Sequence, residues 1–283
     1  MTPAQEIRRF LTTGDHDTLF SRWPGPSFLA KAKKGDRALG DALVAEVRRR
    51  EKERHFPSLP PDFDSSRFVI EKVGPMVRGL FPAKERETVL ELFENSLVFV
   101  TRENIEQVLN EQMWLKTAWD IANLYLGGLD ASGLDGKRVD IVGLSEATTF
   151  FVSTAYFKEE NPFADYVVHE AAHVFHNWKR ERAGLPYTRN REWLLGIDYH
   201  KRELFAYACE AYSRILEQAK HPADRRRLHA DYCERWLPDA DRFDQGELVD
   251  VTAEAVSARN GWKRILHRCS PARHPAGATD SSA

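Results

Sequence analysis

The chain has 283 residues, of which 42% are hydrophobic and 30% are charged, and its formal net charge is -2. This composition is typical of a globular protein that is long enough for one large domain or two small ones. The near balance of charges gives no electrostatic reason to expect binding to nucleic acid or to a membrane surface. We therefore expect neither a nucleic-acid partner nor a membrane association.

The amino terminus and the cysteines indicate a cytoplasmic protein. The first ten residues contain charged side chains and no continuous apolar core, which is unlike a signal peptide. No apolar run approaches the ~18 residues that a membrane span requires. The three cysteines, Cys209, Cys233 and Cys269, match neither a disulfide framework nor a cysteine-based zinc site. We expect their thiols to be reduced and packed.

Residues 1–68 predict a helical N-terminal region. Helices are expected at 3–12 and 37–56, and between them the sequence SRWPGPSF breaks regular structure with two prolines and a glycine. The second helix is rich in lysine and arginine, but interleaved acidic residues favour a solvated face over a nucleic-acid site. The segment 56–68, rich in proline, serine and aspartate, is the expected boundary with the main domain.

The main domain is predicted at 69–268. A helix within 85–95 should lead into a short apolar segment at 96–100, and one long helix is expected at 101–129, ending at a glycine pair. An apolar face with helical spacing should pack this long helix into the core. The residues of that face are Ile105, Val108, Leu109, Met113, Trp114, Ala118, Ile121 and Leu124.

Two strands are predicted at 138–144 and 148–157, because both segments are rich in β-branched or aromatic residues. The second strand is either a sheet edge along which an extended peptide could pair, or an ordinary sheet strand. Its residues are compatible with both interpretations.

The remaining chain is predicted to be helical up to a disordered tail. One helix should run from Asp165 to about Arg180 and another over about 200–220, with two or three more within 222–268. The small, polar, proline-bearing segment 269–283 is the expected tail. The fold class that follows is α+β, mainly helical, with a small sheet.

His169, Glu170 and His173 form an H-E-x-x-H pattern. A step of four residues is nearly one turn of an α-helix, so both imidazoles project from the same face and can reach one metal ion. Glu170 lies about 100° around from His169, where a carboxylate can accept a proton from metal-bound water. Nearly all other positions from 167 to 178 are apolar, and a buried helix rarely carries unpartnered histidines. The pattern therefore favours a zinc site over chance.

A catalytic zinc site usually takes three protein ligands. His176 is seven residues beyond His169, roughly 10 Å along the axis, so we expect it beside the ligands and not among them. Glu203 and Glu210 lie seven residues apart on a helix that is otherwise mostly apolar, and carboxylates there need a partner. From the residues alone, Glu203 ranks only slightly ahead of Glu210 as third ligand.

The two helices together resemble a known family. The H-E-x-x-H motif, followed by a separate helix carrying Glu203-Leu204-Phe205-Ala206, resembles the gluzincin zinc metallopeptidases, and the E-x-F-A segment is similar to that of the anthrax lethal factor group. The resemblance covers about residues 150–216. It implies a zincin-like core, Zn²⁺ as cofactor, Glu203 as third ligand and Glu210 as acceptor for a ligating imidazole. The N-E-x-x-S-D segment of the thermolysin group and the G-x-M-E-N segment of the aminopeptidase group are absent.

These features predict a zinc endopeptidase that acts on a peptide or protein substrate, with Glu170 as general base. A side chain from 187–200 could donate a hydrogen bond to the developing oxyanion; Tyr199 and Tyr187 are the candidates, with His200 behind them. Two alternatives remain: a non-enzymatic regulatory or interaction protein that retains a zincin scaffold, and a metal-dependent hydrolase of a non-peptide bond. Glu170 argues against the first, because a structural zinc site needs no base.

Overall fold

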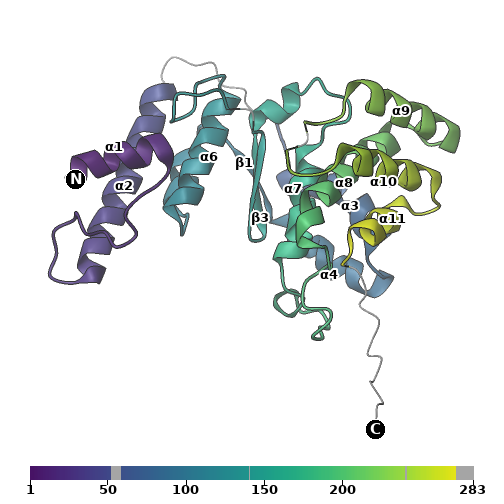
Figure 1. The fold of residues 1–283 in the computed structure, drawn as a ribbon, viewed down its shortest axis with the longest axis horizontal. Coiled ribbons are helices and arrows are strands. Elements are labelled where there is room, and N and C mark those ends of the chain that lie inside the picture. The colour runs from purple at the N-terminus through teal and green to yellow at the C-terminus, as the bar shows by residue number, and fades with distance from the viewer. Residues whose placement is uncertain (52–58, 140, 240, 272–283) are drawn as a thin grey trace, which may run out of the picture.

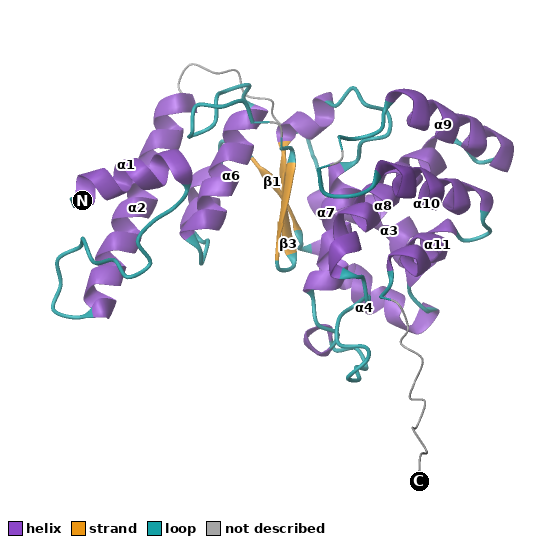
Figure 2. Ribbon diagram, in the orientation of Figure 1, coloured by secondary structure: helices purple, strands orange, loops and turns teal. Residues whose placement is uncertain are grey.

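The computed structural model describes residues 1–51, 59–139, 141–239 and 241–271. A small sheet stands between two layers of helices, and the two layers lie on its opposite faces (Figures 1 and 2). The expectation of a mainly helical α+β fold with a small sheet is therefore confirmed. No helix in the described part of the chain is both long and apolar enough to cross a membrane.

The first layer holds the amino-terminal helices and a later helical pair. Its members are α1 (Pro3–Thr13), α2 (Phe28–Glu51), α5 (Ile105–Asn110) and α6 (Leu115–Gly128). The helix predicted at 3–12 is confirmed, and Thr2 and Gln5 form a reciprocal cap at its start. Helix α2 begins nine residues earlier than predicted, where the hydroxyl of Ser27 accepts a hydrogen bond from the backbone of Ala30. Its predicted end at 52–56 lies outside the described residues.

The single helix predicted at 101–129 is wrong, because the chain breaks between α5 and α6. Leu109 and Ala118 are nine residues apart, which at about 100° per residue puts them on opposite faces of one straight helix. The break lets both side chains enter the same core. Met113 and Trp114, expected on the buried face, lie at the break with 82% and 63% of their surface exposed.

The sheet has three strands in the order β1-β3-β2. Strands β1 (Leu97–Val100) and β3 (Thr149–Ser153) are parallel, and β2 (Gly143–Glu146) is antiparallel to β3. The short apolar segment at 96–100 forms strand β1, although no strand is predicted there from the sequence. The strand predicted at 138–144 starts later, at Gly143, and residue 140 lies outside the described residues. The strand predicted at 148–157 ends at Ser153 and continues as a 3-10 helix.

The interpretation of the second predicted strand as a sheet edge is wrong. Strand β3 is hydrogen-bonded on both sides, and β2 is the edge strand next to it. A central strand must bury both faces, which explains the continuous apolar run Phe150-Phe151-Val152.

The two faces of the sheet belong to two hydrophobic cores. Along β1, Phe99 faces the core of the second helical layer, whereas Val98 and Val100 face the core of the first. In β3, Phe150 belongs to the second core and its neighbour Phe151 to the first. The sheet is therefore a common wall between the cores.

The second layer contains the helix of the H-E-x-x-H motif. Its helices are α3 (Ser65–Leu80), α4 (Ala83–Glu94), α7 (Tyr166–Asn177), α8 (Arg202–Gln218), α9 (Pro222–Arg235), α10 (Gln245–Ser257) and α11 (Gly261–Cys269). The helices predicted at 85–95, near 200–220 and within 222–268 are confirmed. The motif helix ends at Asn177, three residues before the predicted Arg180. All three cysteine thiols are free, and Cys209 and Cys269 are buried.

The predicted domain boundaries can be placed on this architecture. Part of the boundary segment, 52–58, lies outside the described residues, and α3 starts at Ser65 with Asp64 as its cap. The core around α1 and α2 also takes in α5 and α6, so residues 1–68 do not hold a core of their own. At the carboxyl terminus, helix α11 reaches Cys269, and 272–283 lie outside the described residues.

Candidate metal centre

Helix α7 is anchored at its first turn by a buried carboxylate. The side chain of Asp165 accepts a hydrogen bond from the backbone N–H of Val168 at 3.3 Å and forms a 2.8 Å ion pair with Lys72 of α3. Asp165 is fully buried. Burial raises the pKa of Asp165, although the charge of Lys72 acts in the opposite direction. These contacts fix where the motif helix begins.

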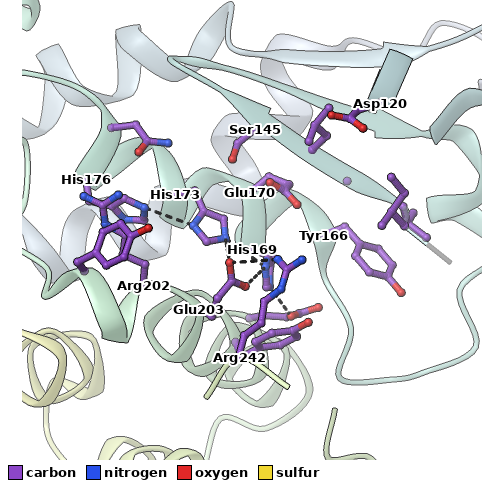
Figure 3. A pocket seen from close by; sticks show the side chains of 18 of the residues that line it. Asp120, Ser145, Tyr166, His169, Glu170, His173, His176, Arg202, Glu203 and Arg242 are labelled. Carbon is purple, nitrogen blue, oxygen red and sulfur yellow. Dashed lines mark hydrogen bonds and ion pairs between the residues drawn. The ribbon is translucent and has the colours of Figure 1, made fainter. Parts of the chain in front are cut away.

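Three side chains converge one turn further along. His169 and His173 of α7 and Glu203 of α8 each offer a ligand atom, and these atoms all lie within 4.8 Å of one another (Figure 3). They could hold a metal ion. Within the described ranges, no other side chain belongs to this group.

The spacing of the donors suits zinc. Two nitrogens bound tetrahedrally at the usual zinc distance lie about 3.3 Å apart, and Nε2 of His169 is 3.3 Å from Nε2 of His173. The oxygens of Glu203 lie 4.0 Å from His169 Nε2 and 3.9 Å from His173 Nε2. These distances exceed tetrahedral spacing by about half an ångström, a gap that rotation of the partly exposed Glu203 side chain can close.

The remaining ring nitrogens have partners that suit metal binding through Nε2. His169 Nδ1 lies 3.0 Å from Glu210 Oε2, and the other oxygen of Glu210 accepts a hydrogen bond from the backbone N–H of Asp165 at 2.7 Å. His173 Nδ1 lies 3.4 Å from His176 Nε2. With hydrogens on both Nδ1 atoms, the Nε2 lone pairs point into the group. Glu203 and Glu210 thus lie on opposite sides of the His169 ring.

Burial and nearby charges set the protonation of these histidines. Burial lowers the pKa of His169, but the hydrogen bond and charge of Glu210 outweigh it and raise that pKa to about 9. The pKa of His173 falls well below its ordinary value through burial and through the charge of His169. Burial and the charge of Arg202 lower the pKa of His176 to about 3. His173 and His176 are therefore neutral near pH 7, and His176 can accept a hydrogen bond.

Glu170 lies beside the group without belonging to it. It is 8% exposed, and burial raises its pKa while the charge of His169 and a hydrogen bond with Ser145 act to lower it. Strand β2 passes directly over this side chain: a Cβ atom on Gly143 would lie 2.7 Å from Glu170 Cγ. Only a glycine lets β2 approach so closely.

The metal group opens into a cleft of about 840 Å³ between the two helical layers. One wall comes from Asp120 of α6 and from 141–145, and the other from α7, α8 and Arg242. Tyr199 and His200 line the cleft, so two of the three oxyanion candidates are near the group. Tyr187, the third, is 55% exposed and is not among the lining residues.

Sequence reasoning missed several residues of the cleft. Arg242 lies in the connection before α10, with Nη1 3.7 Å from Glu203 Oε1, and Arg202 lies at the first turn of α8. Neither has a motif or a spacing that ties it to the histidines. Gly143 lies in the strand predicted at 138–144 and Ser145 just beyond it, but only the packing of β2 places them beside Glu170.

Comparisons with family models, with characterised proteins and with solved structures found no match to this chain.

Proposed function

We propose that this chain is a zinc-dependent peptidase with a zincin-like core. The proposal rests on one observation above all: His169, His173 and Glu203 converge in a cleft with Glu170 beside them as a buried carboxylate that is not a ligand. Two imidazoles and one carboxylate are a donor set of catalytic zinc sites, and three protein ligands leave a position for water. A purely structural site would need no neighbouring base.

The side chains of the cleft would divide into metal ligands, residues that orient the ligands, and a general base. His169, His173 and Glu203 would hold the metal, with Glu210 and His176 orienting the two imidazoles. Zinc bound there would lower the pKa of a coordinated water and polarise the scissile carbonyl. Glu170 accepts a proton from the attacking water and passes it to the nitrogen of the leaving amine, so that the water oxygen ends in the new carboxyl group.

Strand β2 supports a peptide as the substrate. Its residues line the cleft, and β2 lies at the edge of the described sheet. An edge strand offers main-chain N–H and C=O groups to an extended peptide, which can pair with them as an added strand. A substrate held in this way would cross the cleft beside Glu170.

Metal content tests the site. We expect elemental analysis to find about one zinc per chain in the wild type and in Glu170→Gln, and none in Glu203→Ala. Glu210→Ala should still bind zinc, with an affinity lower by about 10- to 100-fold because His169 loses its acceptor. Glu234→Gln, an exposed substitution on α9, serves as a matched control. A wild type that takes up no zinc when it is supplied would favour the interaction-protein alternative.

Activity tests the reaction. The zinc-loaded wild type should cut an unfolded protein into peptides detected by mass spectrometry, and Glu170→Gln should not. A wild type that binds zinc and hydrolyses esters but no peptide bond would support the alternative of a hydrolase for another bond.

A further inference from the structure

Arg202 is a cation in the cleft for which the described part of the chain supplies no acidic partner. It lines the cleft next to the metal group, and among the described residues it forms no ion pair and no hydrogen bond. Its Nε atom is buried and lacks a hydrogen-bond partner. In Figure 3 its side chain lies beside His176, on the side of His173 away from Glu170.

Other partly or fully buried arginines of the described chain have polar partners: Arg86 and Arg225 donate hydrogen bonds to backbone carbonyls, and others form ion pairs. Arg180 lies 2.8 Å from Glu85, and Arg48 lies 3.0 Å from Glu51. Such pairing offsets the cost of removing a guanidinium from water. Arg202 is only partly exposed, and no such partner is seen for it among the described residues, so its guanidinium is available to a ligand.

The guanidinium of Arg202 packs against one aromatic ring. Its Cζ atom lies 5.0 Å from the centre of the Tyr199 ring. An arginine that packs on an aromatic face keeps its in-plane N–H groups available, in the geometry that binds a carboxylate through two hydrogen bonds. Arg242, the other arginine of the cleft, already lies 3.7 Å from Glu203.

We propose that Arg202 binds a carboxylate of the substrate, so that this peptidase acts on peptides with an acidic group close to the scissile bond. The inference rests on the proposed function. One guanidinium matches the single charge of a carboxylate, whereas a dianion would face Glu170, Glu203 and Glu210 across the same cleft. The carboxylate can come from an aspartate or glutamate side chain or from the carboxyl terminus of the peptide.

A peptide-binding assay tests the role of Arg202 without catalytic turnover. Zinc-loaded Glu170→Gln protein would be titrated with fluorescent peptides in matched sets: aspartate or glutamate against asparagine or glutamine, and a free against an amidated carboxyl terminus. We expect removal of the recognised carboxylate to weaken binding about 10- to 100-fold, as for a hydrogen-bonded charge. Adding Arg202→Gln should abolish the difference, Arg202→Lys should keep part of it, and Arg226→Gln on the exposed face of α9 should leave it unchanged.

The outcomes distinguish a side-chain carboxylate from a terminal one, and they distinguish failure of the role of Arg202 from failure of the proposed function. Sensitivity to amidation identifies the carboxyl terminus and hence an exopeptidase, and sensitivity to the side-chain amides identifies an internal acidic residue. The inference is overturned if the Glu170→Gln protein, with Arg202 intact, binds acidic and amide peptides equally. It is also overturned if the Arg202→Gln protein retains its zinc and still prefers the acidic peptide. If the wild type cuts peptides without acidic preference, only the role of Arg202 fails; if it holds no zinc or cuts none, the proposed function fails.

Discussion

Tyr199 lines the cleft, and its hydroxyl and its ring suggest different roles. The sequence suggests a hydroxyl that stabilises an oxyanion, whereas the structure packs the ring against Arg202. We expect Tyr199→Phe to keep kcat within about twofold. Tyr199→Ala should raise KM for acidic peptides by about two- to fivefold, the value of an exposed cation–π contact of about 0.5–1 kcal/mol.

Steady-state kinetics on one acidic peptide and its amide counterpart would check this. Tyr187→Phe, at an exposed tyrosine that does not line the cleft, is the matched control. A large loss of kcat in Tyr199→Phe with unchanged KM would instead support the hydroxyl as an oxyanion donor.

At the scale of single residues, the sequence predicts those parts of the site whose chemistry depends on local spacing. His169, Glu170 and His173 share one helix, so helical geometry alone brings them together. The choice between Glu203 and Glu210 depends on which side of the His169 ring each reaches, and this requires the packing of α7 on α8. The position of Arg242 depends on a connection between helices, for which no periodicity exists.

Strand β2 packs closely on helix α7 at Gly143. A methyl group at Gly143 would meet Cγ of Glu170 at 2.7 Å, and the buried Glu170 side chain would have to move. We expect Gly143→Ala to lower kcat by on the order of 10- to 100-fold, as expected for a displaced catalytic group, with zinc content unchanged.

Kinetics and elemental analysis on the same preparation would separate a displaced Glu170 from a loss of zinc. Gly40→Ala is the control, because a Cβ atom there meets nothing within 4 Å. Loss of zinc from Gly143→Ala would show that β2 supports the ligands and not the base.

The ion pair between α3 and α7 predicts a stability effect that depends on pH. Lys72→Met leaves the buried Asp165 without its cationic partner, so we expect the free energy of unfolding to fall by about 3 kcal/mol near neutral pH. The pKa of Asp165 is already raised by burial and should rise further in the variant. A carboxyl whose folded pKa exceeds its unfolded value loses stability as pH rises through that window.

Urea denaturation at pH 5 and pH 8 measures this. The difference from wild type should be smaller at pH 5 than at pH 8, because protonation at lower pH removes the charge of Asp165 that lacks a partner. Arg67→Met breaks an exposed pair with Glu71 on the same helix and should cost less than about 1 kcal/mol. An equally small loss of unfolding free energy for Lys72→Met would mean that the buried Asp165 does not need the charge of Lys72.

Element prediction failed where tertiary packing outweighs local pattern. The segment around α5 and α6 has helical propensity throughout, but its two apolar stripes are out of phase, and the break at Met113 and Trp114 brings both stripes into one core. Strand β2, Gly-Leu-Ser-Glu, has little strand propensity and exists because β3 offers it a partner. Amphipathic helices such as α8 were predicted well, since their pattern repeats over several turns.

The two hydrophobic cores do not follow the domain boundary that the sequence predicts at residue 68. Leu39, Leu43 and Val47 of α2 are at most 1% exposed, in the same core as α6. Burial of such side chains contributes about 1.5–3 kcal/mol each, so removing all three takes away about 5–9 kcal/mol, comparable with the stability of a typical domain. We expect residues 65–283 not to fold as an independent domain.

Circular dichroism of this fragment beside the full chain, with binding of a dye specific for exposed apolar surface, would test this. A fragment with a sharp thermal transition and bound zinc would show instead that the main domain is autonomous from near residue 65.

If this chain is the proposed peptidase, the place of β2 at the edge of the described sheet would limit which proteins it can cut. A chain that pairs with β2 must be extended for several residues, and a segment within a helix or a packed domain has already committed its main-chain groups. Selection would then act first on conformation and only afterwards on charge. Intact, well-folded proteins would be spared, and linkers, termini and damaged chains would be the segments that reach the cleft.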